Sequence, residues 1–218
     1  MKKLILALLA LNLCYASFGQ DSFEEGKVIS KQTMTSDNEQ AKAQLAMIGD
    51  VETTSYFKGN KTRAEATSPM TGKVISIIDG DSNKMLMLMD SPSMGKVYML
   101  QDISLSEADK KNMEIKKGDE TKSILGYECQ QYFVTMTKDG QTMKMEMFTT
   151  DAISAMSQQT ATFNDKISGF PMYMSMDVNQ MGMNMTITNE VTSIDEEKVD
   201  SGIFDLTPPE GYKDMQPK

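Results

Sequence analysis

This sequence of 218 residues contains neither histidine nor tryptophan. Without histidine it lacks the most common general base and the most common zinc ligand, so neither a Ser-His-Asp nor a Cys-His arrangement can form. Catalysis by two carboxylates needs no histidine, but sugar-cleaving sites of that kind are normally lined with aromatic platforms such as tryptophan. We therefore expect a protein that is not an enzyme and has neither a cofactor nor a metal centre.

Long apolar runs are scarce as well. The run Leu4–Leu13 follows two lysines and is too short to span a bilayer, which takes roughly twenty apolar residues. Small residues follow it, with Ser17 and Gly19 at the −3 and −1 positions of a cleavage site. We expect residues 1–19 to be a signal peptide and residues 20–218 to be a single β-rich domain in the periplasm, with no transmembrane segment after signal removal.

Cysteine occurs only twice. Cys14 falls within the expected signal peptide, and the residue before it is Leu13, where a lipoprotein signal peptidase needs a small side chain. Lipidation of Cys14 is therefore the less favoured alternative. The other cysteine, Cys129, has no partner for an intramolecular disulfide in the mature chain, and we expect it to be buried and inert.

The charge is strongly acidic. Without Lys2 and Lys3 of the signal peptide, the net charge changes from −9 to −11. Such a chain repels phosphate backbones, and the sequence contains no glycine-rich phosphate loop. Nucleic acid is therefore excluded as an expected partner, whereas the oligomeric state stays open.

Short segments with β-forming residues alternate with turn residues along the mature chain, a pattern typical of antiparallel sheets. The expected strands are Lys27–Met34, Thr53–Lys58, Lys61–Ala66, Lys73–Ile78, Lys84–Met89, Val97–Leu100, Gly126–Thr137, Thr142–Thr150, Phe170–Val178 and Met181–Glu190, with a short strand and an extended tail after Val199. The expected short helices are Glu39–Ile48 and Ser106–Met113, and Asp151–Gly169 is either helical or a covering loop.

Methionine is abundant, with twenty-one of the twenty-two residues outside the start position. Many of them recur at every second position, in the sets Met85, Met87, Met89; Met143, Met145, Met147; Met172, Met174, Met176; and Met181, Met183, Met185. Because alternate side chains of a strand share one face, each set predicts a thioether face opposite a polar face.

Three interpretations of these thioether faces stay open. Methionine could fill a closed core, although natural cores usually rely on leucine, isoleucine and valine. It could line an apolar ligand site, since adaptable binding surfaces often use methionine. It could also bind Cu(I), which prefers soft sulfur ligands. We favour ligand binding to a lipid or to lipoprotein acyl chains, through the residues Met143, Met145, Met147, Met172, Met174, Met176, Met181, Met183 and Met185. A structural or partner-docking protein with a closed core is a further alternative.

Three segments resemble one family. They are Tyr56–Arg63, the segment Ile124–Cys129 with its Gly-Tyr-x-Cys pattern, and the closing Phe204–Lys213 with its Pro-x-Gly-Tyr pattern. In their order they are similar to the family grouped as domain of unknown function 4412. The resemblance implies a lipoprotein-carrier (LolA-like) fold of the mainly β class with minor α structure: a curved antiparallel sheet or half-barrel with a few short helices covering the concave face.

The family has no defined activity, so the resemblance transfers no catalytic or binding residue. In lipoprotein carriers an arginine in the cavity is thought to help hold the cargo. Arg63 is the only arginine of this chain, but it does not match that residue, and we expect it at a surface position of a strand.

Overall fold

The structure is a computed structural model that describes residues 22–215, apart from 70, 105, 107–109, 139–140, 158, 162, 164–165 and 181–182. The expected signal peptide, residues 1–19, lies outside the described residues, as do the central turn residues of the hairpin expected around 138–140.

Most of the described chain forms one twelve-stranded sheet, in the order β12-β6-β5-β4-β3-β2-β1-β11-β10-β9-β8-β7. The strands are β1 (Glu25–Ser36), β2 (Val51–Lys58), β3 (Lys61–Ser68), β4 (Gly72–Asp79), β5 (Lys84–Ser91), β6 (Gly95–Asp102), β7 (Met113–Ile124), β8 (Tyr127–Lys138), β9 (Gln141–Thr150), β10 (Phe170–Gln180), β11 (Met183–Asp195) and β12 (Lys213–Asp214). Neighbouring strands are antiparallel except for β12, which pairs in parallel with β6.

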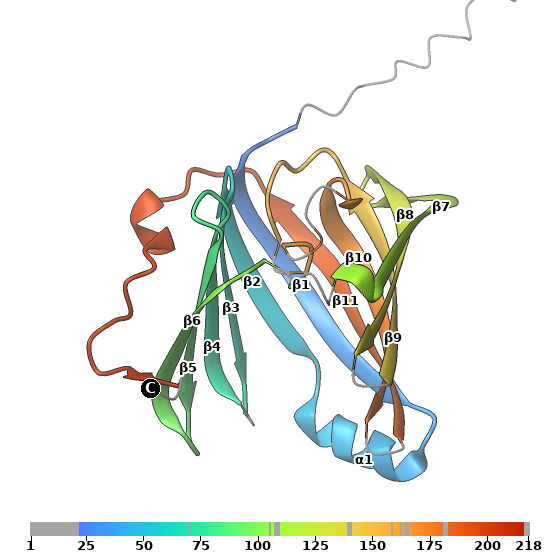
Figure 1. The fold of residues 1–218 in the computed structure, drawn as a ribbon, viewed down its shortest axis with the longest axis horizontal. Coiled ribbons are helices and arrows are strands. Elements are labelled where there is room, and N and C mark those ends of the chain that lie inside the picture. Colours follow the sequence, from blue (N-terminus) through green and yellow to red (C-terminus); the bar gives the residue numbers. More distant parts are fainter. Residues whose placement is uncertain are drawn as a thin grey trace, which may run out of the picture.

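The sheet is curved and not closed. In Figure 1 it forms an arch, with β2 to β6 in one arm, β7 to β11 in the other and β1 between them. The two edges of the sheet are β12 and β7. The expected fold class, a mainly β half-barrel with minor helix, is confirmed.

Tight turns between neighbouring strands hold the register of each arm. At the turn between β3 and β4, Gly72 has a φ of 74°, and a Cβ there would lie 2.1 Å from the carbonyl oxygen of Asp90. Only glycine fits this position without strain, so the strand can approach β5 closely.

The helix α1 (Glu39–Ile48) joins β1 and β2 at one end of the arch (Figure 1). The Asn38 side chain caps it by accepting a hydrogen bond from the backbone N–H of Ala41 at 3.0 Å. The helix expected at Ser106–Met113 lies partly outside the described residues. Lys110 and Lys111 are helical, and Met113 already begins β7.

Two irregular segments cover different faces of the sheet. The described residues of the segment 151–169 lie between the arms and cover the face that we call the inner face (Figure 1). Residues 196–215 run along the opposite, outer face of β3 to β6 and include a short 3-10 helix, η2 (Ser201–Phe204). The segment Asp151–Gly169 is therefore the covering loop of the two alternatives.

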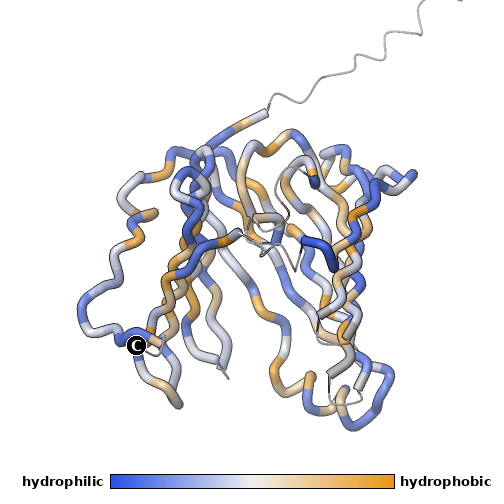
Figure 2. The backbone as a smooth tube through the Cα atoms, in the orientation of Figure 1, coloured by the Kyte–Doolittle hydropathy of each residue, from blue (hydrophilic) through white to orange (hydrophobic). Residues whose placement is uncertain are grey.

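Hydrophobic residues recur along the strands of both arms and in the segment between them (Figure 2). At the end of the arch opposite α1, the ring of Phe57 lies 5.8 Å from that of Phe23 and 6.3 Å from that of Phe170, measured between centroids. This cluster joins strands from both arms, so one core spans the middle of the sheet.

Sequence reasoning missed strand β7. It carries charged side chains such as Glu114 and Lys116, which form an ion pair at 2.8 Å, and it shows no clear apolar alternation. Such a strand forms because β8 supplies its hydrogen bonds, and its charges are typical of a protected sheet edge. After Val199 the chain first forms η2, and the expected short strand is β12.

Candidate functional site

Methionines of β9 and β10 that are cross-strand partners lie on the inner face of the sheet. Met147 is the cross-strand partner of Met174, and Met145 is that of Met176. On the next strand Met185 pairs with Val178, which follows the same alternation. The prediction of a thioether face is therefore confirmed for β9 and β10, and the register joins Met185 of β11 to the same surface.

The nine methionines singled out from the sequence fall into three groups. Met145, Met147 and Met172 are buried, with 9%, 0% and 0% of their surface exposed. Met143, Met174, Met176 and Met185 are half-buried. Of the last two, Met183 begins β11 but its side chain is not described, and Met181 lies outside the described residues.

The buried members fill a core. Phe163 and Ile167, from the segment 151–169, pack with Met145 and Met147 in one apolar cluster. For these two side chains the core-filling interpretation is therefore correct. The half-buried members, in contrast, keep part of their surface exposed.

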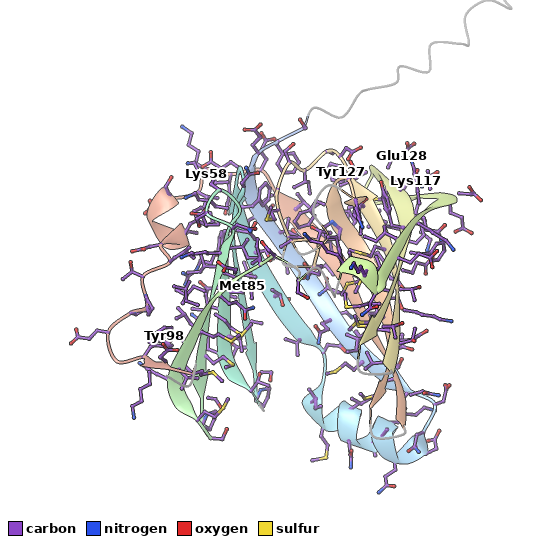
Figure 3. The ribbon with its side chains drawn as sticks, in the orientation of Figure 1. Lys58, Met85, Tyr98, Lys117, Tyr127 and Glu128 are labelled. Carbon is purple, nitrogen blue, oxygen red and sulfur yellow. The ribbon has the colours of Figure 1, made fainter. Side chains whose placement is uncertain are left out.

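A second group of methionines lies on the inner face of the other arm. Met85, Met87 and Met89 of β5 alternate there, and Met99 of β6 is the cross-strand partner of Met87. All four are half-buried. Figure 3 shows Met85 on the inner side of this arm and Tyr98 on its outer side. The sequence pattern revealed the β5 set, but only the strand register adds Met99 to it.

Strand β5 separates two kinds of apolar residue. Its leucines, Leu86 and Leu88, point to the outer face, where the C-terminal segment covers them and leaves them 0% and 4% exposed. Its methionines point to the inner face and stay half-buried. Leucine thus occupies the closed core of this arm, and methionine occupies the face that keeps exposed surface.

The inner face is uncharged over most of its width. On β1 to β6 and β9 to β11, the described residues whose side chains follow the inner-face alternation include no Asp, Glu, Lys or Arg. Charge appears near the edge, where Lys117 of β7 and Glu128 of β8 border a hollow of about 400 Å³. A face of this kind favours an apolar partner, because a buried charge needs a counter-charge.

Arg63 lies on strand β3, as expected, and its side chain is half-buried on the outer face. It contacts Glu65 at 2.7 Å and donates a hydrogen bond to the carbonyl oxygen of Ile203 at 3.1 Å. It therefore helps to hold the C-terminal segment and points away from the methionines.

Glu25 fixes the same segment at its beginning. Its carboxylate accepts hydrogen bonds from the backbone N–H of Val199 and from the ammonium of Lys58. The hydrogen bond from Val199, followed by that from Lys58, lowers the pKa of Glu25 below its ordinary value.

Cys129 is buried, as predicted. None of its surface is exposed, and it forms no disulfide. Burial raises the pKa of its thiol to about 11, so it is neutral at physiological pH.

A further hollow combines charged side chains with one member of the methionine face, Met185. It has a volume of about 580 Å³, lies beside α1 and is bordered by Lys42, Lys144, Asp37 and Asp177. Among the described residues, no group of three His, Cys, Asp or Glu side chains is placed to hold a metal ion. No helix in that part of the chain is long and apolar enough to cross a membrane.

Fold and site together define an open, curved antiparallel sheet with an inner face that is lined with methionine and uncharged over most of its width. The chain belongs to the family described as Domain of unknown function (DUF4412), whose model matches residues 34–212. No curated protein matches the sequence.

Two solved structures show similarity at low identity. PNGF-II is 12% identical with a TM-score of 0.48, and the match covers 88% of this chain and 32% of that one, so this chain spans about a third of its length. The Mycobacterium tuberculosis lipoprotein LppX is 9% identical with a TM-score of 0.36, and the match covers 80% of this chain and 88% of that one.

Proposed function

We propose that this protein is a non-enzymatic protein of the bacterial envelope that binds an apolar ligand, such as the acyl chains of a lipid or lipoprotein, on its inner face. The contrast within β5 is the observation that carries the proposal. Leu86 and Leu88 are sealed under the C-terminal segment, whereas Met85, Met87 and Met89 stay half-buried on the opposite face.

Physical chemistry explains why methionine suits this role. Its thioether side chain is unbranched and flexible, so it packs against ligands of variable shape better than a branched side chain does. The absence of charged side chains on β1 to β6 and β9 to β11 at described inner-face positions removes the penalty for placing hydrocarbon there. Location in the periplasm follows from the expected signal peptide and is part of the proposal.

A charge placed on either face of β10 tests the proposal. Met174 and Ser175 are adjacent and both half-buried, but they point to the inner and outer face respectively. Binding of pyrenedodecane, a fluorescent hydrocarbon, is measured by titration with the mature protein. We expect Met174→Lys to weaken binding by roughly tenfold or more, because hydrocarbon would contact a charge, and Ser175→Lys to leave it unchanged.

Circular dichroism of both variants checks that the sheet is intact. Equal binding by the two lysine variants would place the ligand elsewhere. No binding of the hydrocarbon to the unchanged protein would favour a structural or partner-docking role.

Cross-strand sulfur pairs support Cu(I) binding as a second candidate. Met87 and Met99 face each other across β5 and β6, and thioethers prefer Cu(I). Replacing Met85, Met87 and Met99 with leucine keeps the apolar surface and removes three sulfur atoms. If copper is the ligand, the unchanged protein withdraws Cu(I) from a chromophoric chelator, and this variant does not. If the ligand is hydrocarbon, pyrenedodecane binding persists.

A further inference from the structure

One row of side chains crosses six strands of the inner face in register. It runs through Val28, Ser55, Ala64, Ser76, Met87 and Met99, from β1 to β6. Its middle is small or hydroxyl-bearing, and its β5–β6 end consists of methionine. We call Ser55, Ala64 and Ser76 the hydroxyl floor. Because these side chains are short, they extend less far from the sheet than the methionines beside them.

Ser76 has an unusual environment within this floor. Its residue is 4% exposed, and its Oγ has no hydrogen-bond partner among the described residues. The side chain points to the inner face, because it lies on the same face of β4 as Ile78, two positions away. The Ile78 side chain packs with Ala161 of the segment 151–169. A buried hydroxyl without a partner destabilises a folded protein, and a ligand that accepts its hydrogen bond would remove that cost.

We infer that Ser76 donates a hydrogen bond to the ester carbonyl of an uncharged acyl lipid whose hydrocarbon chain lies along the methionines of β5 and β6. This inference rests on the proposed function and adds the chemical class of the ligand. An ester carbonyl is a neutral acceptor that matches the free donor of Ser76.

The lack of charge decides between an ester and an acid. An ionised carboxylate or phosphate on the floor would need a cation, but the inner-face positions described on β1 to β6 hold none. Burying such an anion costs far more than one hydrogen bond returns. The buried part of the ligand is therefore neutral, and a charged headgroup, where present, stays outside the face.

The cross-strand neighbours of Ser76 differ in size and in freedom to move. Its cross-strand partners are Ala64 on β3 and Met87 on β5. Alanine occupies little space, and the methionine side chain rotates about three bonds. We expect a ligand to reach the hydroxyl by displacing the Met87 side chain, without a change in the strands.

Three probes with one fluorophore and one chain length test the inference on the mature protein. They are pyrenedodecane, methyl pyrenedodecanoate and ionised pyrenedodecanoate at pH 8. We expect the methyl ester to bind roughly threefold to tenfold more tightly than the hydrocarbon, the effect of one net hydrogen bond. We expect the carboxylate to bind at least about tenfold more weakly than the ester.

The variant Ser76→Ala then assigns the preference. It should bind ester and hydrocarbon with equal affinity, while hydrocarbon affinity itself stays unchanged. Without ligand it should melt roughly 2–4 °C higher than the unchanged protein, because an unsatisfied hydroxyl is removed. A purely structural serine would instead lower the melting temperature and leave the ratio of affinities as it was. Ser175→Ala on the outer face is the matched control and should alter neither quantity.

The outcomes separate the two proposals. If hydrocarbon binds and the ester binds no more tightly, or if Ser76→Ala keeps the ester preference, the assignment of Ser76 is wrong and the proposed function stands. If the carboxylate binds as well as the ester, the neutral-ligand inference is wrong. If none of the probes binds, both proposals fail.

Discussion

Leucine and methionine have similar volume and hydrophobicity, and β5 places them on opposite faces. Leu86 and Leu88 have few rotamers and suit a core that is packed once during folding. Met87 and its neighbours keep rotational freedom. This freedom has no benefit in a closed core, but it lets a side chain adapt to ligands that exchange. At the scale of single residues, the choice of side chain therefore distinguishes the sealed face from the accessible one.

Cys129 gives a residue-scale prediction. Because its thiol is fully buried with a pKa of about 11, roughly one molecule in a thousand carries the thiolate at pH 8. We expect no reaction of the folded protein with a disulfide reagent such as Ellman's over minutes, and one equivalent of reaction in denaturant. Rapid labelling of the folded protein would show that the thiol is accessible. Reactivity of the thiol should rise with pH as the solution approaches pH 11.

At the scale of elements, the C-terminal segment acts as the second layer of one arm. Phe204 at the end of η2 is 3% exposed and belongs to the apolar cluster with Ile75 and Leu86. Arg63 and Glu25 fix this segment through hydrogen bonds to its backbone. The outer face of β3 to β6 is thus a closed core only because these residues lie over it.

Truncation of Phe204 tests this layer. We expect Phe204→Ala to lower the free energy of unfolding by about 3–5 kcal/mol, since it leaves a cavity over β4 and β5. Urea unfolding followed by circular dichroism measures the change. Leu125→Ala is the control: Leu125 is 51% exposed, so its truncation should change stability by less than about 0.5 kcal/mol. A loss of similar size in both variants would contradict the role given to the segment.

At the scale of the whole molecule, one sheet runs through both arms without interruption. The long pairings of β1 with β2 and with β11 join the arms. The apolar cluster around Phe57, Phe148 and Met172 spans the same region. The arms therefore share backbone hydrogen bonds and a core, although the sheet does not close.

Shared hydrogen bonds predict cooperative unfolding of the mature chain. We expect a single transition with the same midpoint in far-ultraviolet circular dichroism and in tyrosine fluorescence, as is usual for one domain. Tyr98 lies in the β2–β6 arm and Tyr132 in the other, so tyrosine fluorescence reports on both. Two separate midpoints would show that the arms unfold independently.

The sequence by itself determined most of the strands, the helix Glu39–Ile48 and the division of several strands into a thioether face and a polar face. These features depend on alternation, capping and turn residues, which act over a few neighbouring positions. Tertiary structure decided what depends on distant partners. Strand β7 forms because β8 pairs with it, and Met145 and Met147 are buried because Phe163 and Ile167 pack on them. The same holds for Ser76, whose hydroxyl lies buried beside Met87 only because β3, β4 and β5 pair in this register.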